Sequence, residues 1–266
     1  MHKVAPVTEL TITELPATKP PVIDHACQVM GVTPLTKDTF EVELQSFVSL
    51  NYHAGQYLKL ELDVNGDGQF HSLSYSIANS FNPEQPHRLQ LFIQNSNELT
   101  DKIIKRLTKL NKDKGQVKAT LPMGRAFLQS DLGLNHIFIA AGSGISKIKC
   151  LAEEILKQQA DVNVTIYWSN KHVDDFYLLE EFQHWVEKNK NLTFKTILEC
   201  ADTNWVGLSG YIYEVIKADY DDLNNVQAYL CGSPKMVYGT IDQLKAYGLK
   251  EENCYSDVFE YAPRIK

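Results

Sequence analysis

The hydrophobic rhythm of this chain changes near its middle. From about residue 25 to residue 97, apolar and polar side chains alternate, and glycine, asparagine or proline turns separate the alternating runs. The clearest runs are 40–45, 58–63 and 89–94. A period of two predicts strands with one buried face, and several such strands at this spacing are typical of an antiparallel barrel or sandwich.

Two further elements complete the expected barrel. A helix is predicted over about 101–110, with Thr100 as its N-cap, because a threonine oxygen accepts hydrogen bonds from the free amides at a helix start. A last strand over 116–121 would close the barrel. Residues 1–22 are rich in threonine, proline and glutamate with little periodicity, so we expect an extended or disordered leader there.

After Gly124, short apolar runs alternate with amphipathic segments. Strands are predicted at 136–140, 164–168, 194–198 and 228–230, each followed by a helix, at about 145–158, 178–188, 211–217 and 234–247. This order predicts a parallel sheet covered on both faces, with the carboxyl ends of its strands along one edge. The expected fold therefore has two domains, an antiparallel β-barrel over 23–128 and an α/β domain with a parallel sheet over 129–266.

The composition indicates which kinds of binding partner and which cellular compartment to expect for this protein. The formal net charge is -7, which argues against a nucleic-acid partner because such a partner requires a clustered basic surface. No run of about 18 apolar residues is present, and the N-terminus lacks the apolar region of a signal peptide. The cysteines are scattered, and the histidines show no metal-ligand spacing. Free thiols, a cytoplasmic location, no membrane association and no metal are therefore expected.

The first strand of the second half runs into AAGSGISK at 140–147. A glycine turn between a strand and a helix brings backbone N–H groups close to a phosphate. Lys147 stands where the usual dinucleotide fingerprint has its third glycine, and no acidic residue follows the next strand. Lys171 follows that strand instead, where its charge would suit a nucleotide phosphate such as the 2′-phosphate of NADPH. A solvated lysine is the alternative for Lys171.

A second glycine turn lies late in the chain, in YLCGSPKM at 229–236. A buried strand there runs into Cys231 and Gly232, and Pro234 opens a helix at a position that tolerates proline. Cys231 is expected at the carboxyl edge of the sheet, facing the same cleft as Gly142–Gly144. A packing role is the alternative for Cys231, but two glycine turns that converge on one edge favour a site.

Several segments together resemble a known family. The flavin-binding barrel of the ferredoxin–NADP reductase superfamily resembles HAGQYLKL and SYSIAN, and its pyridine-nucleotide half resembles AAGSGISK, YWSNK, NWVGLSG, YLCGSPKM and the terminal YSDVFEYAP. The similarity runs over 25–266 in the family's order and is greatest to bacterial NAD(P)H–flavin reductases, including luciferase-associated ones. It implies a barrel that binds FAD or FMN and a second domain that binds NADH or NADPH.

The resemblance implies a flavin site on the strand within HSLSYSIANS, at 71–80. In the family this strand reads R-x-Y-S and packs against the isoalloxazine ring, whereas here it reads LSYS at 73–76. Ser74 is a candidate cofactor-binding residue on this strand, Tyr75 would stack on the ring, and Ser76 would form a hydrogen bond to the N5 edge, where hydride arrives. A core aromatic is the alternative for Tyr75. After this stretch, Ile77 and Ala78 would offer backbone groups to the pyrimidine end of the flavin.

The same comparison implies how firmly the flavin is held. Leu73 replaces the arginine that neutralises the flavin phosphate in the family, and losing one charge-assisted bond weakens affinity about tenfold to a hundredfold. We therefore expect a loosely bound flavin that serves as a substrate. In members with tightly bound flavin, a G-x-x-S/T at a helix start holds phosphate. Asn97-Glu98-Leu99-Thr100 fits this pattern in part, so Thr100 is a candidate phosphate ligand as well as an N-cap.

In the nucleotide half, the resemblance places Gly142, Ser143, Gly144 and Gly232 against the nicotinamide coenzyme. The segment WVGL at 205–208 resembles W-x-G-R without its arginine, which weakens the case for NADPH, while Lys171 supports it. The coenzyme preference therefore stays open. In the aromatic C-terminus, Phe259 and Tyr261 would cover the flavin or close the sheet.

The implied reaction is hydride transfer from nicotinamide C4 to flavin N5, for which the protein mainly positions two rings. Ser76 and Cys231 are the candidate catalytic residues, with Cys231 as a shaping group and not a nucleophile. One alternative is an electron-transfer reductase that retains FAD and serves a separate oxygenase, ferredoxin or ferric acceptor. Another is a non-catalytic nucleotide-binding interaction protein, which the departures at Leu73, Lys147 and Leu208 keep open.

Overall fold

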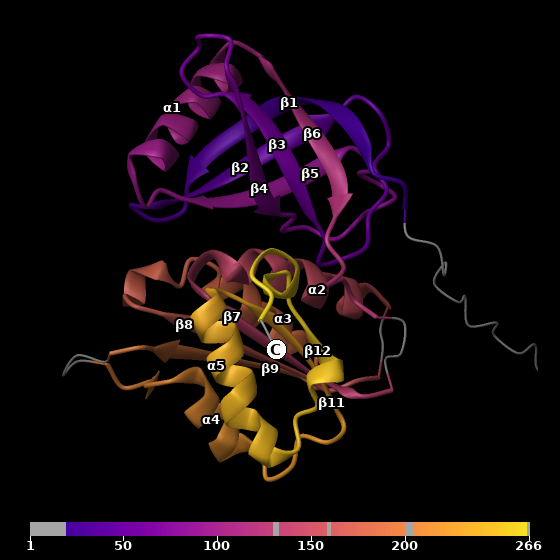
Figure 1. Cartoon of the computed structure of the whole chain (residues 1–266), viewed down its shortest axis with the longest axis vertical. Coiled ribbons are helices and arrows are strands. Elements are labelled where there is room, and N and C mark those ends of the chain that lie inside the picture. The colour runs from indigo at the N-terminus through magenta and orange to yellow at the C-terminus, as the bar shows by residue number, and fades with distance from the viewer. Residues whose placement is uncertain (1–19, 130–132, 159–160, 201–204, 265–266) are drawn as a thin grey trace, which may run out of the picture.

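The computed structural model describes residues 20–129, 133–158, 161–200 and 205–264. Two sheets lie one above the other: a curled antiparallel sheet of six strands and a parallel sheet of six strands (Figure 1). This confirms the predicted fold class. Most of the predicted leader, residues 1–19, lies outside the described residues.

The antiparallel sheet contains six strands from the first half of the chain. They are β1 (Ile23–Pro34), β2 (Thr39–Ser46), β3 (Tyr57–Asp63), β4 (Phe70–Ser76), β5 (Arg88–Gln94) and β6 (Gln116–Met123). Their order is β4-β3-β6-β1-β2-β5. The strand predicted to close the barrel, β6, instead pairs with β3 and β1 in the middle of the sheet. The barrel stays open between the edge strands β4 and β5.

Asn79 bridges part of that opening with its side chain. Its amide nitrogen donates to the carbonyl of Arg88 at 3.2 Å, and its amide oxygen accepts from the backbone of Gln90 at 2.8 Å. An asparagine amide has the same donor and acceptor as a peptide group, so it can replace one rung of a strand ladder. The segment after β4 is thereby tied to β5 without a continuous strand.

Helix α1 (Glu98–Lys112) packs its apolar face onto the barrel core. The prediction that Thr100 is its N-cap is wrong. Asn97 is the N-cap, and its side chain accepts from the Thr100 amide at 3.1 Å while Thr100 Oγ1 accepts from the Asn97 amide at 3.0 Å. This reciprocal capping box starts the helix earlier than predicted, because asparagine is among the best capping residues.

The parallel sheet contains the strands of the second half, in the order β10-β9-β8-β7-β11-β12. They are β7 (Asn135–Ala141), β8 (Val164–Asn170), β9 (Leu192–Leu198), β10 (Leu208–Ser209), β11 (Val226–Cys231) and β12 (Cys254–Tyr255). The helices are α2 (Ile145–Gln158), α3 (Leu179–Lys188), α4 (Ile212–Asp219), α5 (Pro234–Leu244) and α6 (Val258–Tyr261). The four predicted strand–helix pairs are confirmed. Helices α2 and α3 pack on one face, and α4 and α5 pack on the other.

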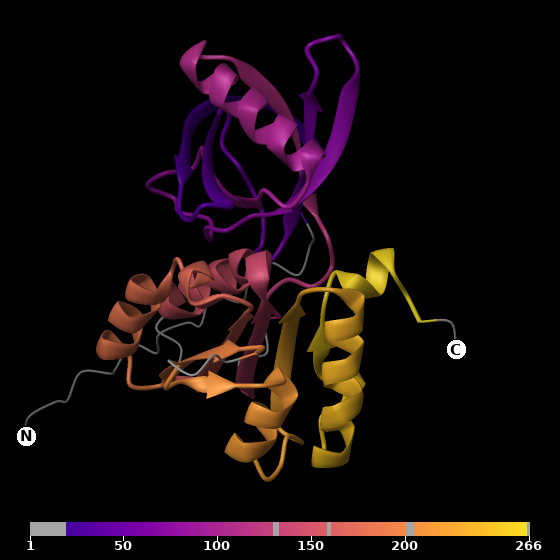
Figure 2. The same ribbon diagram turned by 90° about the vertical axis from the view of Figure 1, so that its left-hand side faces the viewer.

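Helix α2 belongs to the α/β domain and lies directly beneath the barrel, against which it packs (Figure 2). The Cys150 thiol accepts from the Gly55 amide at 3.4 Å and donates to the Asn79 carbonyl at 3.1 Å. The Glu153 carboxylate accepts from the Ser80 amide at 2.7 Å. Apolar barrel residues also belong to the same buried cluster as α2. These contacts set how the barrel faces the carboxyl edge of the parallel sheet.

Candidate active site

The carboxyl ends of β7 and β11 meet at the edge of the parallel sheet that faces the barrel. β8 lies on one side of β7 and β11 on the other, so the chain reverses its winding direction between them. Ligands of open α/β sheets bind at such a switch point. Both predicted glycine turns lie here: Gly142–Gly144 follows β7, and Gly232 follows β11.

A cleft of about 300 Å³ lies between the two domains at this edge. Its barrel wall consists of Tyr57, Ser74, Tyr75 and Ser76 from β3 and β4. Its other wall includes Cys231, Gly232, Asp257 and Tyr261 from the end of β11 and the C-terminal segment. The structure therefore brings the predicted pair Ser76 and Cys231 to one cleft.

The barrel wall of the cleft is formed mainly by the edge strand β4, whose successive side chains point to opposite faces of the sheet. Tyr75 packs partly against the barrel core and also lines the cleft, and burial raises the pKa of its phenol to about 12. It therefore stays an uncharged aromatic surface at neutral pH. Ser74 is exposed, and Ser76 lies opposite Tyr57 in the β3–β4 ladder. Leu73 also packs against the barrel core and is not a lining residue of this cleft.

The backbone amides of Ile77 and Ala78 are already used inside the barrel domain. Ile77 donates to the Gln56 carbonyl at 3.2 Å, and Ala78 donates to the Gln90 carbonyl at 2.8 Å. Both side chains are fully buried. The prediction that these residues offer backbone groups to a flavin is therefore restricted to their carbonyl oxygens.

Gly142, Ser143 and Gly144 do not line the cleft themselves but lie next to its other wall, where the backbone approaches so closely that only glycine fits at Gly144. A Cβ atom there would overlap the carbonyl oxygen of Cys231, so the turn after β7 and the end of β11 lie in direct contact. Gly142 has φ +55, a left-handed conformation that glycine adopts without strain. Its carbonyl accepts from the Trp168 indole at 2.9 Å. Ser143, between the two glycines, accepts through its carbonyl from the Ser146 hydroxyl at 2.8 Å.

Cys231 is a free thiol at the end of β11. Burial raises the pKa of this thiol to about 11; the Lys147 charge opposes this rise and the Asp257 carboxylate adds to it. The thiol is therefore protonated at neutral pH, which suits a shaping group better than a nucleophile.

An ion pair behind this wall was missed by the sequence analysis. Lys147 Nζ donates to Asp257 Oδ2 at 2.8 Å, although the two residues lie 110 positions apart in the chain. Asp257 Oδ1 is buried without a hydrogen-bond partner among the described residues. Lys147 in place of the third fingerprint glycine indicated that this turn departs from the usual dinucleotide site, but the sequence did not identify the partner of the lysine.

Three predicted site residues lie elsewhere. Thr100 is engaged in the α1 capping box, and α1 packs on the barrel away from the parallel sheet (Figure 1). Lys171 is exposed just after β8. Phe259 packs against Tyr238 of α5, with ring centroids 5.7 Å apart, whereas its neighbour Tyr261 lines the cleft. Of the two predicted aromatic covers, only Tyr261 lies at the cleft.

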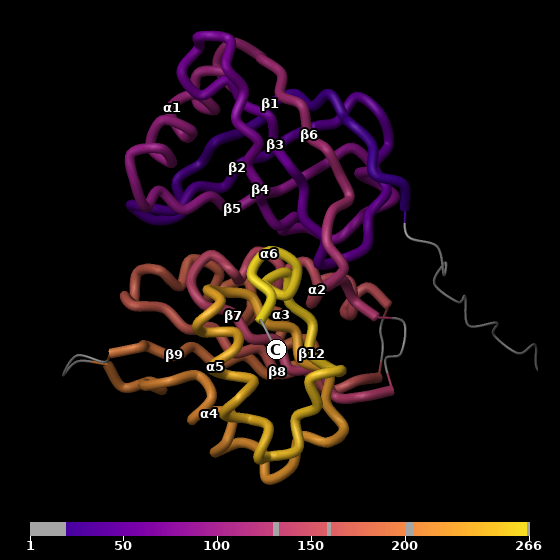
Figure 3. The backbone as a smooth tube through the Cα atoms, viewed as in Figure 1, coloured from indigo at the N-terminus to yellow at the C-terminus, as the bar shows by residue number. Residues whose placement is uncertain are grey.

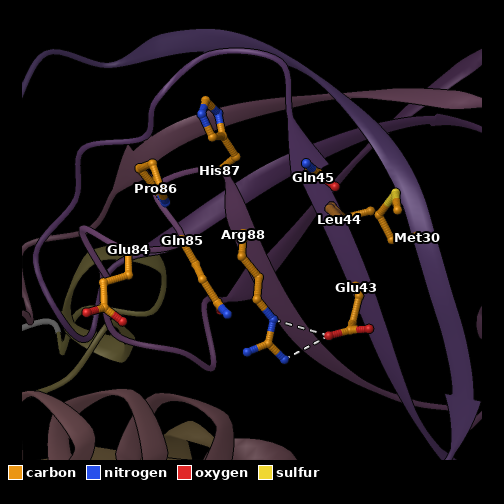
Figure 4. Close-up of a pocket in the computed structure, with 9 residues that line it drawn as sticks. All are labelled: Met30, Glu43, Leu44, Gln45, Glu84, Gln85, Pro86, His87 and Arg88. Atoms are coloured by element: carbon orange, nitrogen blue, oxygen red, sulfur yellow. Dashed lines mark hydrogen bonds and ion pairs between the residues drawn. The ribbon is translucent and has the colours of Figure 1, made fainter.

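A larger pocket on the barrel surface is lined by residues of the barrel domain alone (Figure 4). Its arginine, Arg88, donates to Glu43 from two nitrogens, at 2.7 and 3.2 Å, and its other lining residues come from β1, β2 and the loop before β5. No residue of the parallel sheet lines it. The cleft between the domains is therefore the better candidate.

The residues of this cleft fit a flat, partly polar aromatic ligand. Tyr75 supplies an uncharged aromatic surface, Ser76 a small hydroxyl, and Asp257 one buried oxygen, Oδ1, without a hydrogen-bond partner among the described residues. Among the described residues, no group of three or more potential metal ligands occurs. In the same part of the chain, no helix is both long and apolar enough to cross a membrane.

Comparison with known proteins agrees with this geometry. Residues 138–241 match the family model of the oxidoreductase NAD-binding domain. An NAD(P)H-flavin reductase of Aliivibrio fischeri is 23% identical over 237 residues, which cover 88% of this chain and 98% of that protein. A probable flavin reductase of Vibrio harveyi is 26% identical over 239 residues, which cover 88% and 99%.

Among solved structures, a ferredoxin reductase in carbazole 1,9a-dioxygenase superposes with a TM-score of 0.74 at 24% identity. The superposition covers 91% of this chain and 70% of that one, so both domains share the arrangement. The likeness recognised in the sequence is confirmed: the chain contains an oxidoreductase NAD-binding domain, is similar to flavin reductases in sequence and shares the fold of a ferredoxin reductase.

Proposed function

We propose that this protein is an NAD(P)H–flavin oxidoreductase, which transfers hydride from nicotinamide C4 to flavin N5. One observation carries the proposal: a single cleft is lined from both domains, by Tyr75 and Ser76 on the barrel side and by Cys231 and Gly232 at the switch point of the parallel sheet. Hydride transfer needs two rings in close contact, and a cleft with one wall from each domain provides that geometry.

The residues have separate roles in this proposal. Flavin and nicotinamide supply the electronic part of the chemistry when they are bound. Tyr75 offers a face for ring stacking, and Ser76 places a hydroxyl at the reacting edge. Gly142 and Gly144 let the backbone approach the coenzyme, and the protonated thiol of Cys231 shapes the cleft beside it.

We propose that the flavin is exchanged as a substrate. Leu73 packs against the barrel core where the family has a phosphate-binding arginine, and the Thr100 hydroxyl is engaged in the helix cap. Neither residue then offers a charged or free group to a flavin phosphate. The barrel wall retains contacts for the ring, which riboflavin, FMN and FAD share.

The second candidate is an electron-transfer reductase that retains FAD. It is supported by the structural likeness to a ferredoxin reductase in carbazole 1,9a-dioxygenase and by a sequence likeness to the phenol 2-monooxygenase reductase component DmpP, at 25% identity. In that case the partner would be an oxygenase or another electron acceptor. A non-catalytic nucleotide-binding role is the third candidate.

Flavin retention and turnover distinguish these three functions. We expect the purified chain to lose its colour on gel filtration, and to oxidise NADH or NADPH when riboflavin, FMN or FAD is added. A chain that stays yellow through gel filtration would favour the reductase with retained FAD. Absence of turnover with all pairs of coenzyme and flavin, from a chain that binds them, would favour the non-catalytic role.

We further propose a cytoplasmic location, because all five cysteines are free thiols. The proposed division into a flavin domain over 23–128 and a nucleotide domain over 129–266 places the boundary in the connection between β6 and β7.

A further inference from the structure

Lys147 and Asp257 form an ion pair whose position needs an explanation. Lys147 lies in the first turn of α2 and is 0% exposed, and Asp257 immediately precedes α6 and lines the cleft. A lysine is almost never fully buried without a partner, and a positive charge in the first turn of a helix opposes the helix dipole. Burial of this cation is therefore costly, and the carboxylate of Asp257 is its ion-pair partner.

The pair fixes the direction in which the carboxylate points. Oδ2 of Asp257 is held by Lys147, which leaves Oδ1 turned toward Gly124 and Tyr57. A Cβ atom on Gly124 would lie 3.0 Å from Oδ1 and 2.9 Å from Cδ1 of Tyr57, so glycine keeps this corner open. Helix α6, which follows Asp257, lies between the two domains (Figure 3), and its Glu260 accepts from the Arg125 amide at 2.6 Å.

We propose that Lys147 is a positioning residue that holds Asp257 as an anion against the cleft, so that the site favours the oxidised nicotinamide ring over the reduced one. The inference rests on the proposed function. When C4 gives up hydride with its electron pair, the nicotinamide ring becomes a cation, whereas the reduced ring is neutral. A fixed negative charge in a poorly hydrated cleft stabilises the cation and acts little on the neutral ring.

Lys147 acts here only through Asp257. Without the ammonium, the carboxylate loses its ion-pair partner and turns out to water, because an unpaired buried charge is unfavourable. The discrimination between the two forms of the coenzyme is then lost. A merely structural lysine would weaken binding of both forms alike, so the ratio of the two affinities separates the two roles.

The test uses equilibrium binding to the full chain freed of flavin, with no turnover. Dissociation constants for NAD⁺, NADH, NADP⁺ and NADPH are measured by titration calorimetry for the wild type, Lys147→Met, Asp257→Asn and the double variant. In each variant we expect the affinity for the oxidised form, relative to the reduced form, to fall about fivefold. The double variant should match the single ones, because the two residues act as a unit.

The double variant also guards against misfolding. Replacing a buried ion pair by uncharged side chains of similar size is often tolerated, whereas removing one partner strands the other charge. If the single variants do not fold, the double variant alone decides the question through its affinity ratio. A ratio equal to that of the wild type would overturn the proposal.

Lys149→Met is the matched control. Lys149 lies two residues further along α2, is 4% exposed and pairs with Glu153 and Glu181, but it does not line the cleft. Its loss should lower stability without changing the affinity ratio. An equal change of the affinity ratio in Lys147→Met and Lys149→Met would show that the change comes only from helix packing.

The same titrations separate this inference from the proposed function. If the wild type binds no nucleotide, the proposed function fails as well. If it binds both forms and no variant changes the ratio, only this inference fails.

Discussion

The two walls of the cleft are built by opposite means. On the barrel side, the edge strand β4 presents side chains: an exposed Ser74, a partly buried Tyr75 and Ser76. On the α/β side, the turn after β7 lies so close to Cys231 that Gly144 can carry no side chain. The first wall therefore depends on which side chains are present, and the second on the absence of one. Substitutions on the first wall should therefore have effects that vary with the side chain, whereas any side chain added at Gly144 should have a large effect.

The largest effect is expected from Gly144→Ala. The added methyl group would overlap the carbonyl oxygen of Cys231, which is backbone and cannot rotate away. We expect a loss of about 3 kcal/mol in the free energy of unfolding and weaker coenzyme binding, because the two glycine turns must move apart. Urea denaturation and coenzyme titration measure the two quantities.

Gly239→Ala is its control, since a Cβ atom there meets nothing within 4 Å. Gly239 lies inside α5, where alanine is the better helix former, so this variant should gain up to about 1 kcal/mol. Equal stabilities of the two variants would contradict the close approach at Gly144.

An intermediate effect is expected from Ser76→Ala on the barrel wall. Loss of one positioned hydrogen bond should lower the rate of hydride transfer about tenfold to a hundredfold, with coenzyme affinity unchanged. Stopped-flow absorbance of flavin reduction measures this step directly.

Ser72→Ala is the control for that prediction. Ser72 lies on the same side of the same strand, is exposed and does not line the cleft, so its loss should leave the rate unchanged. If hydride transfer is unaffected in both variants, Ser76 has no place in the reaction.

The smallest effect is expected from Thr100→Ala, away from both walls. This change removes half of the capping box of α1 and should cost about 1 kcal/mol of stability. The relative turnover of riboflavin and FMN should not change, because the hydroxyl is engaged in the cap. A selective loss of FMN activity would show that Thr100 is a phosphate ligand and that the flavin site includes the start of α1.

The longer strands and the helices of the parallel sheet were predictable because each of these strands contains a short apolar run and each helix has one apolar face. Burial imposes these periods locally, so β7, β8, β9 and β11 and their helices were found to within a few residues. β10, β12 and α6 have two to four residues each, too few to show a period. Asn97 was overlooked as N-cap because Thr100 alone also satisfies the usual capping pattern.

The sequence by itself determined the two domains, the two glycine turns and the strand that carries Tyr75 and Ser76, since periodicity and turn chemistry are local properties. Only the tertiary structure decided which polar groups remain available to a ligand. The Thr100 hydroxyl and the Ile77 amide are used by neighbours, whereas Asp257 keeps one oxygen without a partner among the described residues. The pairing of Asp257 with Lys147 spans 110 positions, and it arises because the C-terminal segment returns to the start of α2. Such a contact depends on how distant elements pack, and no local pattern records it.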